Sequence, residues 1–209
     1  MNIFADNLKT TKMKKIILTI AAICAVSFAN AQDSTDGTPG FAKGDLYLTG
    51  TAGFSNVKTG DSKDNSFTLS PGLGYFITEN VALEGQLSYM SGTVENGGVE
   101  TKTDGFGITA GAKYFWTPAS RFSLSLGANI SYMSTKVEVG GADGTEKEMG
   151  INIPLGLHYF VSDSFAITSS YGGFGYSSND NGGNGADKTN GFNLGLDMSS
   201  ISFGLIYKL

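Results

Sequence analysis

The sequence predicts an all-β fold, an eight-stranded antiparallel up-and-down β-barrel, from its composition, its residue alternation and its connection lengths. Of its 209 residues, 30 are Gly, 14 are Phe, 9 are Tyr and only 4 are Pro, and 40% are hydrophobic. A chain this apolar is not disordered, and beyond its start it has no run of about 20 apolar residues that could cross a bilayer as a helix. The composition therefore excludes a disordered chain and a helical membrane protein, and it favours strands rich in Gly and aromatic residues.

An export signal precedes the predicted barrel. Lys14 and Lys15 lead into an apolar stretch over residues 16–28, and the small residues of Ala29-Asn30-Ala31 suit cleavage by a signal peptidase. The stretch is too short to span a hydrocarbon core about 30 Å thick. We therefore expect residues 1–31 to be a cleaved signal peptide.

Further boundaries follow from this signal. Met13 stands directly before the two lysines and is the expected start of translation. Residues 32–42 are expected to form a periplasmic tail, and residues 43–209 are expected to form the barrel. Cys24, the only cysteine, would leave with the signal, so the mature chain is expected to have no disulfide and no thiolate chemistry.

Large apolar residues alternate with small or polar ones at the period of two that is typical of strands. In the clearest case Phe106 and Ile108 share one face, while Gly107 and Thr109 share the other. Eight segments follow the pattern: residues 46–55, 67–76, 81–89, 106–116, 122–132, 151–159, 165–177 and 191–209. The polar face of these segments is small as well as polar, which suits the interior of a narrow barrel.

Two of the eight segments contain irregularities. Gly172-Gly173 in the seventh segment predicts a β-bulge, because glycine inside a strand often marks one. In the eighth segment the apolar positions are even before Ser199-Ser200 and odd after it. One extra residue at this point would return the apolar side chains to the same face.

The connections between the strands alternate between short and long. The short ones are residues 77–80, 117–120 and 161–164, and the long ones are residues 57–66, 92–104, 135–148 and 178–190. The long connections are rich in Gly, Asn, Asp, Lys and Thr and contain almost no large apolar residue. We expect four solvated loops at one end of the barrel and tight turns at the other.

An internal repeat, G-x-x-Y-F, ends the strand before each short turn. It occurs at residues 72–76, 111–115 and 156–160, and a partial copy stands at residues 204–207. Tyr and Trp at one end of neighbouring strands are typical of an aromatic girdle at a membrane interface. The residues expected in this girdle are Tyr75, Tyr114, Trp116, Tyr159 and Tyr207.

The periodicity by itself fits two architectures. In a soluble lipocalin-like barrel the large apolar residues point into a ligand cavity, whereas in a membrane barrel they face lipid and small polar residues occupy the lumen. The girdle, the alternating connections and the export signal favour the membrane barrel. A secreted or periplasmic barrel that binds an apolar ligand is the alternative.

Residues 43–209 resemble the small outer-membrane β-barrel proteins of Gram-negative bacteria, of the OmpX and OmpA transmembrane-domain type, a group often called a porin family. The resemblance rests on the G-x-x-Y-F strand ends, the eight strands and the alternating C-terminal segment from Ile201 to Leu209. It implies an outer-membrane location in contact with lipid. It also implies that the C-terminal segment is read by the barrel-assembly machinery.

Charged residues are expected in the lumen as well. The interior of an eight-stranded barrel is just wide enough for side chains to fill it, so a wide pore is not expected, and charges inside it need partners. Glu84 and Lys113 are expected to face each other on neighbouring strands, with Arg121 and Asp197 joining them from the fifth and eighth strands. We interpret these four residues as a structural network of paired charges, with a narrow ion path as the alternative.

No sequence motif predicts catalysis, a cofactor or a metal site. Residues 105–110 match a dinucleotide fingerprint but lie within a strand, with no helix after them. His158, the only histidine, stands beside a short turn, which argues against a hydrolase at the cell surface. Residues 182–187 match one calcium-binding hexad, but such repeats bind calcium by stacking, so calcium binding by the loop at residues 178–190 has weak support.

The charge balance excludes a nucleic acid partner. The net charge is −5 and Arg121 is the only arginine, whereas a phosphate backbone requires a basic surface. The sequence as a whole predicts a non-enzymatic outer-membrane barrel with a side-chain-filled lumen. We expect its role to be structural or adhesive, with surface loops that meet a partner.

Overall fold

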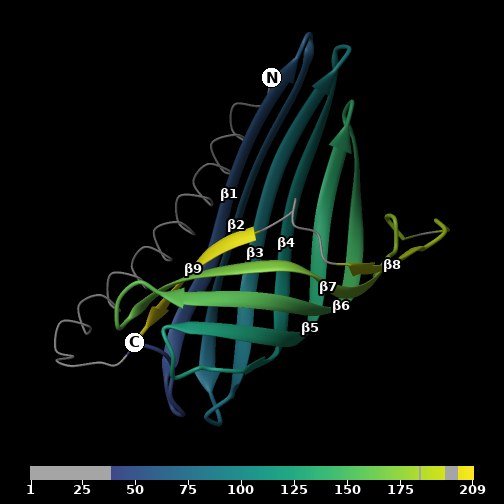
Figure 1. The fold of residues 1–209 in the computed structure, drawn as a ribbon. Coiled ribbons are helices and arrows are strands. Elements are labelled where there is room, and N and C mark those ends of the chain that lie inside the picture. Colours follow the sequence, from purple (N-terminus) through teal and green to yellow (C-terminus); the bar gives the residue numbers. More distant parts are fainter. Residues whose placement is uncertain (1–38, 184, 196–201) are drawn as a thin grey trace. The chain divides into compact units, whose positions relative to one another are not determined.

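Every regular element in the described part of the chain is a β-strand (Figure 1). The computed structural model describes residues 39–183, 185–195 and 202–209. No helix in these ranges is long and apolar enough to cross a membrane. The strands are β1 (Leu46–Thr59), β2 (Ser62–Phe76), β3 (Val81–Asn96), β4 (Val99–Phe115), β5 (Phe122–Val139), β6 (Ala142–Phe160), β7 (Phe165–Asn179), β8 (Thr189–Gly195) and β9 (Ser202–Lys208).

The strands form a closed antiparallel barrel of eight strands, as the sequence predicts. Each strand from β1 to β7 pairs with its neighbour in the chain, and β9 pairs with both β1 and β7 to close the sheet. β8 pairs with the other part of β7, from Gly173 to Asn179. β8 and β9 therefore share the place of the eighth strand.

The pairing register is unbroken from β1 to β6. Between β3 and β4, for example, the same register runs from Val81 opposite Tyr114 to Asn96 opposite Val99, and the other four pairs keep theirs as well. Side chains alternate between the two faces of a strand, so an unbroken register keeps odd and even positions on their faces along the whole strand. The face of each residue is therefore known up to the strand tips.

The predicted bulge in the seventh strand is confirmed. The register between β6 and β7 shifts by one residue between Pro154 and Gly156, which lie opposite Gly173 and Ser170. Two residues of β7 therefore face one residue of β6, as in a bulge.

The eighth strand changes its outward positions, as its sequence pattern predicts. Phe192 and Leu194 are exposed in β8, at even positions, whereas Phe203 and Leu205 are exposed in β9, at odd positions. The change falls between the two strands, and its predicted location at Ser199-Ser200 lies outside the described residues.

Large apolar side chains cover the outer face of the barrel. Leu87, Ile108 and Ile130 are 48%, 51% and 65% exposed. Gln86 and Thr109, their neighbours in the chain, instead line the lumen. A soluble barrel with an apolar ligand cavity would show the opposite arrangement, so these faces suit a barrel that meets lipid.

Three of the four predicted loops are β-hairpins: they are exposed to solvent, as expected, but they are paired strands and not irregular loops. The paired strands extend through most of residues 57–66, 92–104 and 135–148. Each pair ends in a two-residue turn, after Thr59, Asn96 and Val139. The three short connections lie where they are predicted, after β2, β4 and β6. The barrel therefore carries three strand-built hairpins at one end and tight turns at the other.

Glycine pairs account for two of these hairpin turns. Gly97 and Gly98 have φ angles of 57° and 82°, and Gly140 and Gly141 have φ angles of 57° and 91°. Two successive residues with positive φ form a turn whose twist matches that of paired strands. The polar composition indicates exposure to solvent, but the glycine pair is the stronger signal, because it allows the ladder to continue to the tip.

The fourth connection, between β7 and β8, is an irregular loop that is fixed at its start. The Asp180 carboxylate accepts hydrogen bonds from the backbone N–H groups of Lys147 at 2.8 Å and Gly182 at 3.2 Å. The bond from Lys147 is the main reason that the pKa of Asp180 lies below its usual value. Asn181, with a φ of 49°, donates from its side chain to the Asp187 carbonyl at 2.7 Å.

Leu126 tests the lipid-facing assignment. It lies on the outer face of β5 between Phe122 and Tyr132 and is 38% exposed. Leu126→Lys should lower the free energy of unfolding by about 2 to 4 kcal/mol, because it places a charge near the middle of the lipid band. The measurement is urea unfolding of the barrel in lipid vesicles, read by the difference in electrophoretic mobility with and without boiling.

The control is Ser134→Lys, which lies on the same face of β5 beyond Tyr132. It should change the free energy of unfolding by less than about 0.5 kcal/mol, as surface substitutions usually do. Equal losses in the two variants would contradict the assignment.

Candidate functional site

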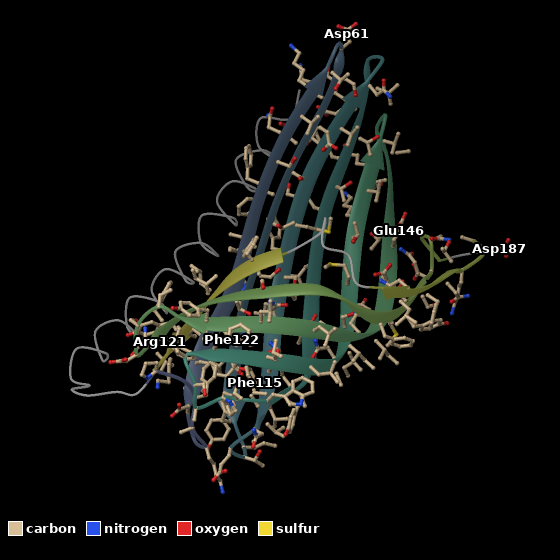
Figure 2. All side chains as sticks on the ribbon, viewed as in Figure 1. Asp61, Phe115, Arg121, Phe122, Glu146 and Asp187 are labelled. Carbon is tan, nitrogen blue, oxygen red and sulfur yellow. The ribbon has the colours of Figure 1, made fainter. Side chains whose placement is uncertain are left out.

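Aromatic rings occupy the barrel at the end where the short turns lie. Phe76, Phe115 and Phe160 are the last residues of β2, β4 and β6, and each is fully buried. They are also the final residues of the three G-x-x-Y-F repeats. Because neighbouring residues of a strand point to opposite faces, the Tyr of each repeat faces out and the Phe faces in. Figure 2 shows Phe115 far from Asp61, which lies in the turn of the β1–β2 hairpin.

Phe41, from the segment before β1, fills the space between these rings. Its ring centroid lies 4.7 Å from that of Phe76, 5.4 Å from that of Phe115, 4.8 Å from that of Phe160 and 5.1 Å from that of Tyr47. We call these five residues the aromatic floor. The expected periplasmic tail over residues 32–42 therefore reaches the barrel interior at Phe41, while residues 32–38 lie outside the described residues.

Three hydrogen bonds hold the segment that carries Phe41. The Phe41 N–H donates to the Pro118 carbonyl at 2.7 Å, and the Lys208 ammonium donates to the Gly40 carbonyl at 2.8 Å. The Ala42 N–H donates to the Asp45 carboxylate at 2.8 Å. Gly40 has a φ of 119°, and a Cβ there would meet the backbone of Ala119 at 2.6 Å, so only glycine fits this close approach.

A polar cavity of about 170 Å³ lies in the lumen. Such a volume is well below the roughly 300–1,000 Å³ of pockets for drug-sized ligands. The lumen is therefore only partly filled by side chains. The polar residues that line the cavity are Thr49, Thr51, Glu84, Gln86, Thr109, Lys113, Ser125, Asn129, His158, Thr168, Ser169 and Ser170.

Glu84 and Lys113 form an ion pair in the wall of this cavity. The Lys113 ammonium lies 2.8 Å from one carboxylate oxygen of Glu84 and 2.9 Å from the other, and both side chains are mostly buried. The Tyr47 hydroxyl donates a hydrogen bond to the same carboxylate. Because Tyr47 also belongs to the aromatic floor, it links the floor to the ion pair.

The other two residues of the expected network do not join this pair. Arg121 lies in the turn before β5, where it is exposed, so the expectation that it joins the lumenal charges is not met (Figure 2). Asp197 lies outside the described residues. Tyr47, which the charge pattern of the sequence does not indicate, takes part instead. Its ring lies over Gly74 on β2, where a side chain would collide with it, and the sequence of neither strand indicates this contact.

Each ring nitrogen of His158 shares a hydrogen bond with a hydroxyl group. Ser125 Oγ lies 2.7 Å from Nε2, and Thr168 Oγ1 lies 2.8 Å from Nδ1. The imidazole is almost fully buried and packs against Phe115, with ring centroids 4.9 Å apart. The group that orients the ring is a hydroxyl rather than the carboxylate of a catalytic triad, so this geometry is that of a packed histidine that supports the floor.

The expected girdle residues lie on the outer face beside the short turns. Tyr75, Tyr114, Trp116 and Tyr159 are 45% to 50% exposed, and Tyr207 is half-buried. A second set of outward aromatic residues, which no repeat in the sequence marks, lies nearer the hairpins. Its members are Phe54, Phe67, Tyr89, Phe106, Tyr132, Tyr176 and Phe192. These residues, called here the outer girdle, complete the two aromatic bands that bound a lipid-facing surface about 25 Å tall.

The closed barrel, its apolar outer face and its two aromatic bands define a membrane-spanning β-barrel. The chain belongs to the outer membrane protein beta-barrel domain family, whose model matches residues 18–199. The family places the protein in the outer membrane. A search of curated proteins finds no match.

Several solved structures are similar to this one. The N-terminal β-barrel domain of OprF from Pseudomonas aeruginosa is 12% identical, with a TM-score of 0.48, over 81% of this chain and 100% of that one. Neisserial surface protein A is 20% identical, with a TM-score of 0.47, over 78% and 97% of the two chains. Ail, the attachment invasion locus protein of Yersinia pestis, is 15% identical, with a TM-score of 0.47, over 80% and 99%.

The Glu84–Lys113 pair gives a prediction about stability. Lys113→Met leaves the buried Glu84 carboxylate with the Tyr47 hydroxyl alone and should lower the free energy of unfolding by about 3 kcal/mol. Urea unfolding in lipid vesicles measures the loss. The double variant Glu84→Gln with Lys113→Met should recover part of it, because no uncompensated charge remains. A double variant less stable than Lys113→Met would contradict the pairing.

Proposed function

We propose that this protein is a non-conducting outer-membrane barrel with a structural and adhesive role, which it performs through the three hairpins. The observation that carries the proposal is that β1 to β6 continue as paired strands beyond the outer girdle. A hydrogen-bonded hairpin holds its side chains in fixed positions, whereas a flexible loop must be ordered at an entropic cost when it binds a partner. The hairpins therefore offer a preformed surface outside the membrane.

Ion pairs on the outward face of the hairpins support this rigid display. Lys63 lies 3.1 Å from Glu95, and Lys136 lies 2.8 Å from Asp143. The hydrogen bond and charge of Lys136 hold the pKa of Asp143 below its usual value. These exposed pairs add little stability individually, but they join neighbouring strands of the hairpins.

The lumen is less suited to conduct ions than the hairpins are to bind a partner. The polar cavity and the Glu84–Lys113 pair favour the alternative, a narrow ion channel. However, the aromatic floor lies across the barrel at its inner end, and ions do not cross packed apolar rings without losing their hydration. This favours a closed barrel.

Export and assembly are part of the same proposal. Residues 1–31 would act as the signal peptide, and the segment from Ile201 to Leu209 would be read by the barrel-assembly machinery. In support of the second role, β9 keeps alternating faces, with Phe203 and Leu205 exposed and Ile206 buried, and it pairs with β1 to close the barrel. Ile201 itself lies outside the described residues.

Phe41 provides the test of the closed lumen. In planar bilayers the wild-type protein should show no discrete conductance, whereas Phe41→Ala should show conductance steps, because it removes the ring that fills the centre of the aromatic floor. Phe203→Ala, which removes a lipid-facing ring that is 67% exposed, is the control and should stay silent. Conductance by the wild type equal to that of Phe41→Ala would favour the channel instead.

Shortened hairpins test the adhesive role. One variant shortens two hairpins by whole residue pairs. It lacks residues 91–94 with their partners 101–104, and residues 136–139 with their partners 142–145. The remaining residues stay on their inner or outer faces, and both glycine turns are kept. Bacteria that display this variant should lose most of their adhesion to surfaces coated with fibronectin, laminin or collagen. Faster electrophoretic migration before boiling verifies that the variant is assembled. Undiminished adhesion by the shortened barrel would contradict the role.

A further inference from the structure

Beyond the outer girdle the aliphatic side chains of the strands change face. Within the lipid band the outer face is apolar and the inner face is small and polar. In the hairpins every lysine points outward, together with several carboxylates: Lys58, Lys63, Lys102, Lys136, Lys147, Glu95, Glu100, Asp104, Glu138 and Asp143. The inner face of the same hairpins carries valines instead.

The unbroken register identifies these valines. Val57, Val94 and Val139 belong to one cross-strand row, in which directly paired residues succeed one another from β1 to β6 and share a face. This row is Val57, Asp64, Val94, Thr101, Val139 and Ala142. The face is the inner one, because Thr51 of β1 and Gln86 of β3 have the same parity as Val57 and Val94 and line the lumenal cavity.

These side chains are exposed although they point inward. Val57, Val94 and Val139 are 54%, 41% and 44% exposed. Val99 and Val137 lie at neighbouring positions of the same face. Val99 is 53% exposed, and Val137 is half-buried. Exposed aliphatic side chains grouped on one face typically mark a surface that binds something.

The charges on this face have one sign. Asp64, Glu146 and Glu148 lie on the inner face, and among the described hairpin residues no lysine or arginine joins them there. Glu146 accepts a hydrogen bond from the Asn179 side chain at 3.3 Å, and Asp64 and Glu148 are exposed. The inner face therefore combines aliphatic side chains with negative charge. We call it the inner hairpin face, made up of Val57, Val94, Val99, Val137, Val139, Asp64, Glu146 and Glu148.

We propose that the inner hairpin face is a docking site for a cationic amphipathic peptide segment of another molecule. The apolar side chains of the segment would lie on the valines, and its lysines or arginines would meet Asp64, Glu146 and Glu148. Charge complementarity selects this occupant, since an anionic segment would meet like charges. The inference rests on the proposed binding role of the hairpins and names the face and the chemistry of the partner.

The test uses the full barrel in nanodiscs of zwitterionic lipid and a fluorescent amphipathic peptide built from Leu and Lys. Fluorescence anisotropy, corrected with empty nanodiscs, should show saturable binding that weakens as salt rises, because charge pairing contributes to it. Matched peptides with Gln or Glu in place of Lys should bind at least about tenfold more weakly. Equal affinity for all three peptides, or no saturable binding, would overturn the proposal.

Two matched pairs of variants locate the site. Val94→Lys, on the inner face, should weaken binding of the Leu/Lys peptide at least about tenfold, whereas Thr93→Lys, the adjacent residue on the outer face, should leave it unchanged. Asp64→Asn should weaken binding severalfold and reduce its salt dependence, and Asp61→Asn in the hairpin turn should not. Electrophoretic mobility without boiling shows that each variant is folded. Equal effects within either pair would overturn the placement on the inner face.

Failure of this inference is distinguishable from failure of the proposed function. If shortened hairpins abolish bacterial adhesion but the Leu/Lys peptide does not bind, the adhesive role stands and the inner hairpin face is not its site. If the peptide binds but shortening the hairpins leaves adhesion unchanged, the face is a docking site and adhesion is not its purpose.

Discussion

A single pairing register from β1 to β6 is the constraint on which the rest of the structure depends. In lipid every N–H and C=O group must find its partner within the protein, which favours long paired strands, and β1 to β6 keep one register along their whole length. A ladder without slips keeps each residue on its face over the whole length of the strand. This register places four surfaces at different positions along the same strands: the lipid face, the lumen, the aromatic floor and the inner face of the hairpins.

Glycines on the inner faces determine what the lumen can hold. Tyr47 lies over Gly74, and the Asn129 side chain lies over Gly111, where a Cβ would collide with it. Side chains that lie along the wall in this way leave the centre of the barrel open, which accounts for the polar cavity in so narrow a barrel. At the inner end the rings of Phe41 and its neighbours are large enough to meet across the lumen, so the same barrel is open in its middle and closed at its base.

The lumenal site was predictable from the sequence where it depends on the alternation of inward and outward side chains along a strand. Glu84 and Lys113 were found because both lie on inner faces of adjacent strands, and the register brings their charged groups together. Arg121 was misplaced because alternation says nothing once a strand has ended in a turn. Tyr47 was missed because its role depends on a glycine of β2, which is distant in sequence. The hairpins were taken for loops because polar composition was weighed above the glycine pairs at their tips.

The sequence by itself determined the number of strands, their inner and outer faces, the short turns and the membrane-facing class of barrel, because alternation and turn chemistry act between residues close in the chain. The tertiary structure decided which residues meet across the barrel. The floor needs Phe41 from before β1 together with rings from β1, β2, β4 and β6, and the inner hairpin face needs valines from β1, β3, β4 and β5. Such groupings depend on how the closed sheet brings distant strands together, and no local pattern in the chain specifies that packing.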